Sequence, residues 1–109
     1  MFIINEDWAF RIDKQENWLP LRNREVVKNK GKADETTVLE YCHTGTFHNN
    51  MWELFTRIAK NTWLECLEEE EGRSKSVSLE RFGEIVGEAK DYLDTVAEEL
   101  KRISKENKL

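Results

Sequence analysis

Residues 79–103 read LERFGEIVGEAKDYLDTVAEELKRI, and this stretch decides the second half of the fold. Its apolar residues recur at alternating spacings of three and four, without a miss: Leu79, Phe82, Val86, Ala89, Leu93, Val96, Leu100 and Ile103. This heptad seam predicts one amphipathic helix from about residue 79 to residue 105, with Ser78 as its N-cap. Gly83 and Gly87 lie four residues apart within it. Each costs about 1 kcal/mol of helix stability relative to Ala, so the pair favours a close approach of another helix.

Such a helix is roughly 40 Å long at 1.5 Å per residue, which is more than the core of so short a chain covers. We therefore expect the distal part of the seam to pack on a second copy, forming a homodimer, or on another protein partner. The predicted interaction residues are Leu93, Val96, Leu100 and Ile103. A helical hairpin with residues 50–69, or a four-helix bundle in a dimer, is the alternative use of the same apolar stripe.

Upstream of the seam, residues 50–69 carry a second helical pattern. Its apolar and small side chains recur every three or four residues at Met51, Leu54, Phe55, Ile58, Thr62 and Cys66. Residues 72–78 break the period and are predicted to be a connection between the two helices.

The first part of the chain has the period of two that is typical of strands. Trp8, Phe10 and Ile12 alternate with smaller or polar residues, and further strands are predicted from Trp18 to Val27 and from Thr36 to Cys42. Pro20 favours an edge position or a bulge for the second of these. The fold class is therefore α+β, with a three-stranded antiparallel sheet covered by a helix in residues 1–71, a connection at 72–78, and the long helix at 79–109.

Composition limits the classes of function. The 109 residues carry a net charge of -5, which disfavours duplex DNA or an anionic membrane as a partner of the whole surface. No segment is apolar enough to span a membrane or to direct secretion, so we expect a cytoplasmic protein whose Cys42 and Cys66 are reduced.

Reactive side chains cluster only around Cys42, His43 and His48. A thiol beside imidazoles can serve as a nucleophile with its base, or as a set of metal ligands. The spacing matches no specific catalytic or zinc pattern, however, because a structural zinc site needs a fourth ligand in a second short pair. We therefore predict no catalytic residue, no metal and no cofactor.

Nucleic-acid recognition is the alternative function. A basic hairpin carries Arg22, Arg24, Lys28, Lys30 and Lys32 near Trp8 and Trp18, and such a surface can grip phosphates and stack bases. The acidic cluster Glu65, Glu68, Glu69, Glu70 and Glu71 indicates the opposite possibility, a mimic of nucleic acid that inhibits a host enzyme.

The layout of the chain resembles small uncharacterised proteins encoded by phages and prophages of bacteria. The resemblance rests on the opening strand of residues 3–13, the Asn17-Trp18-Leu19 step, the Lys-Gly-Lys turn within residues 26–32, the strand entering a helix over 38–60, and the charged C-terminal helix. It implies a phage-type setting in a bacterial host cell and no site residues.

Overall fold

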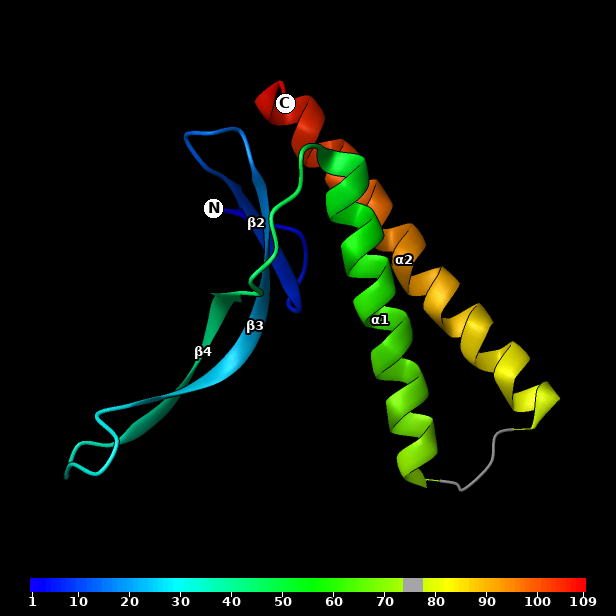
Figure 1. Ribbon diagram of the computed structural model, residues 1–109, viewed down its shortest axis with the longest axis horizontal. Helices are drawn as coiled ribbons and strands as arrows, with labels where there is room; N and C mark the ends of the chain where they lie inside the picture. The colour runs from blue at the N-terminus through cyan, green and yellow to red at the C-terminus, as the bar shows by residue number, and fades with distance from the viewer. Residues whose placement is uncertain (74–77) are drawn as a thin grey trace. The chain divides into compact units, whose positions relative to one another are not determined.

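The computed structural model of the chain describes residues 1–73 and 78–109, and the side chains of residues 1–70 and 78–109. It confirms the α+β class, with a four-stranded antiparallel sheet followed by two helices, of which the last is the longer (Figure 1). Most of the predicted connection at 72–78 lies outside the described residues. The chain divides into two compact units, residues 1–51 and residues 52–109.

The sheet is a meander with the strand order β1-β2-β3-β4. Its strands are β1 (Phe2–Ile3), β2 (Trp8–Ile12), β3 (Trp18–Lys28) and β4 (Thr36–His43). The three strands predicted from the sequence are confirmed within one or two residues, whereas β1 was not predicted. Two residues are too few to show a period. The backbone of Ile4 instead donates to Trp8 at 3.0 Å, and the Asn5 carboxamide oxygen accepts from the Trp8 backbone at 2.8 Å, which together close a tight turn onto β2.

Pro20 does not lie on an edge strand, because β3 pairs with β2 on one side and with β4 on the other. The sheet accommodates it where β4 has already ended. Both the backbone N–H and the hydroxyl of Thr44 donate to the Pro20 carbonyl, at 3.3 and 3.2 Å. The carbonyl of Pro20 is therefore used, and its missing N–H removes no bond from the paired part of β4.

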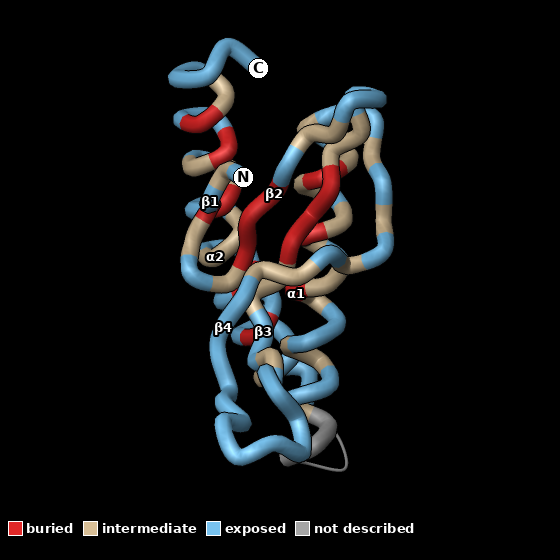
Figure 2. The backbone as a smooth tube through the Cα atoms, turned by 90° about the vertical axis from the view of Figure 1, so that its left-hand side faces the viewer, coloured by how far each residue is buried: buried red, intermediate tan, exposed pale blue. Residues whose placement is uncertain are grey.

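Burial in the sheet unit is concentrated in β2 and the first half of β3 (Figure 2). Trp8, Ala9 and Phe10 are all buried in β2. The predicted alternation correctly put Trp8 and Phe10 on a buried face, but it did not predict that Ala9, on the opposite face, is buried as well. Beyond Leu21 the β3–β4 hairpin has no buried residue, and every residue from Lys28 to Glu40 is exposed. This part of the sheet is a two-stranded ribbon.

The helical unit is a hairpin of α1 (Met51–Arg73) and α2 (Leu79–Asn107). Ser78 caps α2 as predicted, since its hydroxyl accepts from the Arg81 backbone at 3.1 Å. The two helices meet through an edge-to-face contact of Trp63 with Phe82, with ring centroids 5.6 Å apart, and they run antiparallel (Figure 1).

The buried side of α2 does not follow the heptad seam along its whole length. Ile85, Ala89, Val96, Leu100 and Ile103 are buried. The seam residues Leu79, Phe82 and Val86 are exposed, by 88%, 41% and 41%. A straight α-helix drifts by about 20° per heptad relative to a strict repeat of seven, so a seam that is buried at one end rotates away from the core at the other.

Candidate functional site

The exposed end of the seam forms a continuous strip along the first two turns of α2, which we name the α2 flank. It consists of Leu79, Phe82, Gly83, Val86 and Gly87. Residues three and four apart on a helix are neighbours on its surface, so these five residues adjoin one another. Phe82 also rests on Trp63 of α1, which holds its ring in place. The α2 flank is thus an apolar and small-residue surface on one side of a helix.

The two glycines of the α2 flank have no packing role among the described residues. A methyl group placed on Gly83 or on Gly87 meets nothing within 4 Å. Each glycine nevertheless destabilises the helix by about 1 kcal/mol relative to Ala. The close helix approach that the spacing predicts is therefore not made by any described part of this chain.

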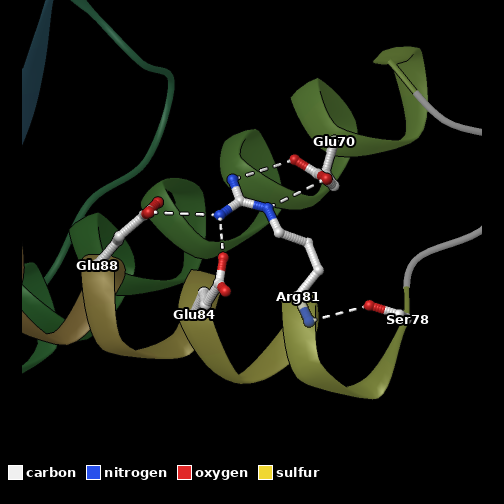
Figure 3. A network of polar contacts seen from close by, with 5 residues as sticks. All are labelled: Glu70, Ser78, Arg81, Glu84 and Glu88. Atoms are coloured by element: carbon white, nitrogen blue, oxygen red, sulfur yellow. Dashed lines mark hydrogen bonds and ion pairs between the residues drawn. The ribbon is translucent and has the colours of Figure 1, made fainter.

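On another side of α2, an ion-pair network joins α2 to α1 around Arg81 (Figure 3). The Arg81 guanidinium contacts Glu70 of α1 at 3.2 Å, and Glu84 and Glu88 of α2 at 2.9 and 3.4 Å. Hydrogen bonds that the guanidinium donates to these carboxylates, first Glu70 and then Glu84, raise the pKa of Arg81 above its ordinary value. The guanidinium therefore stays charged, and a single cation ties the end of α1 to the start of α2.

This half of the hairpin carries a strong excess of negative charge. Residues 64–70 and 78–94 contain nine carboxylates against two basic residues. The carboxylates are Glu65, Glu68, Glu69, Glu70, Glu80, Glu84, Glu88, Asp91 and Asp94. Both basic residues are engaged, Arg81 in the network and Lys90 with Asp94 at 2.9 Å. The α2 flank consequently lies in a negative electrostatic field.

The four interaction residues predicted from the sequence lie in the second half of α2. Val96, Leu100 and Ile103 are buried within the chain, with at most 4% of their surface exposed, and Leu93 is half-buried. Burial assigns the apolar surface of these three side chains to the chain's own core, and leaves the first half of the seam as the accessible part.

The five predicted nucleic-acid contacts do not form one free basic surface. Arg22 lies over the Trp8 ring, 5.0 Å from its centroid, and 3.8 Å from Asp7. Lys28 pairs with Glu40 at 2.9 Å. Arg24, Lys30 and Lys32 are exposed.

Acids lie among these basic residues, because residues 22–40 also contain Glu25, Asp34, Glu35 and Glu40. At the tip of the hairpin, the Asn29 side chain donates to Asp34 at 3.0 Å. The hairpin is therefore close to neutral.

Cys42, His43 and His48 each have a local structural role. The Cys42 thiol donates to the Glu40 carbonyl at 3.5 Å, and the His43 ring packs on the edge of Phe47. The His48 ring bonds the Thr46 hydroxyl at 2.9 Å, while its backbone pairs with Trp18. Cys42 and His43 are consecutive in β4, so their side chains point to opposite faces of the sheet.

Cys66 lies beside the Arg81 network, in a hollow that it shares with Ile85 and with charged side chains including Glu69 and Glu88. Burial and then the nearby carboxylates raise the pKa of the Cys66 thiol. Since the thiolate is the reactive form, this environment suppresses nucleophilic chemistry at Cys66.

No family model, curated protein or solved structure matches this chain. Within residues 1–73 and 78–109, no group of three or more His, Cys, Asp or Glu side chains is arranged to hold a metal ion. In the same part of the chain, neither helix has an apolar stretch that could cross a membrane.

Proposed function

We propose that this protein is a non-enzymatic interaction module that docks through the α2 flank onto an amphipathic helix of a partner protein. The observation that carries this proposal is the exposure of Leu79, Phe82 and Val86 beside two glycines that nothing in the described chain packs against. An apolar helix face laid against another helix is a common mode of recognition, with contacts at spacings of three and four.

The energetics of such docking are favourable. Fully burying a Leu, Val or Phe side chain contributes about 1.5–3 kcal/mol, and Leu79 alone has almost all of its surface available. Gly83 and Gly87 let the two helix backbones approach closely, which increases dispersion contacts along the strip. The exposed strip covers little more than one heptad. It therefore suits a short docking helix better than a long coiled coil, which needs three to four heptads.

The charge around the α2 flank supports a basic partner. Residues 64–70 and 78–94, which include the flank, carry nine carboxylates, and the two basic residues within these ranges are already paired. A helix with Lys or Arg beside its apolar residues gains from this field, while an acidic helix is repelled. A mimic of nucleic acid would use the same carboxylates but would not need the apolar side chains.

The setting that we propose is a phage-type or prophage-type adaptor acting in the cytoplasm of a bacterial host, without a cofactor. This setting rests on the resemblance of the sequence described above. The adaptor role rests on the α2 flank, because a small module with an apolar strip and a strong local charge recruits a partner without performing chemistry on it.

The proposal can be tested with a synthetic amphipathic peptide of helical period, built from Leu and Lys and labelled for fluorescence anisotropy. We expect it to bind the wild-type chain, and the same peptide with Glu in place of Lys not to bind. The double variant Phe82→Ser and Val86→Ser keeps every charge, so it separates apolar docking from charge attraction.

A loss of at least tenfold in affinity for the basic peptide in the double variant supports docking at the α2 flank. The matched control is Leu109→Ser, which removes a similarly exposed apolar side chain two residues beyond the C-terminal end of α2 and should bind as the wild type does. Undiminished binding by the double variant would refute the role of the flank and favour an acidic mimic.

A further inference from the structure

The free edge of β4 is a second unused surface, and it is independent of the α2 flank. β4 is the last strand of the sheet and pairs only with β3, so among the described residues no strand lies on its other side. Its eight residues give it enough length to pair with a further strand.

The register identifies which backbone groups face that edge. The Thr44 N–H donates to the Pro20 carbonyl, and this pair continues the register of Leu21 with His43. Because hydrogen-bonded and non-hydrogen-bonded pairs alternate in an antiparallel ladder, the bonds to β3 come from the even-numbered residues of β4. The N–H and C=O groups of Thr37, Leu39 and Tyr41 therefore point outward.

The side chains of β4 do not protect this edge. Natural edge strands are usually blocked by Lys, Pro, a bulge or very short length. Residues 36–42 of β4 include no Lys and no Pro, and their one charged side chain, Glu40, pairs with Lys28 at 2.9 Å. Leu39 is 68% exposed, and Val27 of β3 is exposed on the same face of the ribbon, two residue pairs away. The edge is thus both open and partly apolar.

We propose that two copies of this chain pair through β4, antiparallel and centred on Leu39, to form a dimer with one continuous eight-stranded sheet. This arrangement has a two-fold axis, so each copy offers the same surface to the other. It sets Leu39 opposite Leu39 and Thr37 opposite Tyr41, which are favourable cross-strand pairs. The outward groups of these residues then form about six hydrogen bonds between the copies.

The charge distribution identifies the occupant of this edge as a second copy. The chain as a whole carries -5, which opposes self-association through an acidic surface. At β4 the Glu40 carboxylate already has Lys28 beside it, so two copies meet there without strong repulsion. The stretch that contains the α2 flank, residues 64–70 and 78–94, has nine carboxylates against two basic residues and lacks this property. Self-association is therefore assigned to the sheet, and the docking of a basic partner to α2.

The test is the solution mass by light scattering over a dilution series. The wild type should have about twice 13.0 kDa. Leu39→Lys places a charge at the centre of the interface and should give a monomer, with circular dichroism showing an intact fold. The matched control, Leu79→Lys, changes an exposed apolar residue of the α2 flank by the same charge and should remain a dimer. A wild-type monomer at every concentration, or a dimer that is lost in the control but kept in Leu39→Lys, would overturn the proposal.

The register is tested by cross-linking in a background of Cys42→Ser and Cys66→Ser. In the proposed pairing the two Leu39 Cα atoms lie about 5.5 Å apart, a separation that a disulfide spans. Leu39→Cys should therefore give a disulfide-linked dimer on mild oxidation, whereas Thr37→Cys, which faces Tyr41 of the other copy, should give little. Equal cross-linking of both variants, or cross-linking of Thr37→Cys alone, contradicts the register.

Discussion

Replacing both Gly83 and Gly87 by Ala should make the protein more stable while it weakens docking. In each case the added methyl group meets nothing within 4 Å, and neither glycine has a positive φ, so the folded state accepts the change without strain. In a helix interior Ala is favoured over Gly by about 0.8–1.0 kcal/mol. The two substitutions together should raise the free energy of unfolding by about 2 kcal/mol.

This gain is measured by urea unfolding followed by far-ultraviolet circular dichroism. One kcal/mol corresponds to about 4–8 °C in the Tm of a domain of this size, so thermal unfolding should shift upward by roughly 10 °C. The same variant should bind the basic model peptide less tightly than the wild type, because the methyl groups keep the two helix backbones apart.

A matched control comes from Gly45, where a methyl group also meets nothing within 4 Å but the backbone has φ +88°. Gly45→Ala should lower stability by about 1–2 kcal/mol, since an L-residue is strained in the left-handed region. An added methyl group has free space at all three glycines, so a gain in stability on α2 and a loss at Gly45 would show that backbone conformation decides the sign of the effect. If the double variant of α2 is no more stable than the wild type, Gly83 and Gly87 do have a packing role in the folded chain. If the double variant is more stable but binds the peptide as tightly as the wild type, the two glycines have no role in docking.

Two further predictions concern α2 and its surroundings. Leu100→Ala should lower the free energy of unfolding by about 2–5 kcal/mol, whereas Leu79→Ala should change it by less than about 0.5 kcal/mol, because the two leucines are 2% and 88% exposed. Equal losses of stability in urea unfolding would contradict the division of the seam into an exposed first part and a buried second part. In a Cys42→Ser background, the rate of maleimide labelling at Cys66 should rise with pH through a midpoint above that of an exposed cysteine in a short peptide, because burial and the nearby Glu69 and Glu65 raise the pKa of this thiol. A midpoint below that of the peptide would contradict the environment described here.

Much of the fold was predictable from local pattern. The strands at Trp8, Trp18 and Thr36 have β-branched and aromatic residues bounded by turn residues, and the structure places them within one or two positions of the prediction. The turn at the hairpin tip was also predictable, because Asn and Gly are the residues that most readily adopt positive φ, as Asn29 and Gly31 both do there. The helix start at Ser78 follows from its capping hydroxyl.

The features that the sequence did not reveal depend on how the strands pair and on how the buried side of α2 rotates along the helix. β1 is stabilised by hydrogen bonds to β2 and has no pattern of its own. Pro20 is tolerated inside the sheet only because β4 ends before it, which is a matter of strand length rather than of local preference. The sequence could not indicate which half of the heptad seam is accessible, because all eight seam positions carry apolar residues at the same spacing. One signal was present: Ile85 and Tyr92 flank the seam, and a buried stripe that includes Ile85 must turn away from Val86.

The two proposed surfaces follow from one physical contrast. On α2 the apolar strip belongs to a stretch, residues 64–70 and 78–94, in which carboxylates far outnumber basic residues and both basic residues are paired, so a like-charged copy is repelled and a basic helix is attracted. On β4 the single carboxylate is neutralised by a lysine of the neighbouring strand, and the outward backbone groups have no net charge, so an identical copy can approach. Added salt should therefore weaken peptide docking at α2, through screening, while leaving the β4 dimer nearly unchanged. Salt-sensitive dimerisation together with salt-insensitive docking would reverse this assignment of the two surfaces.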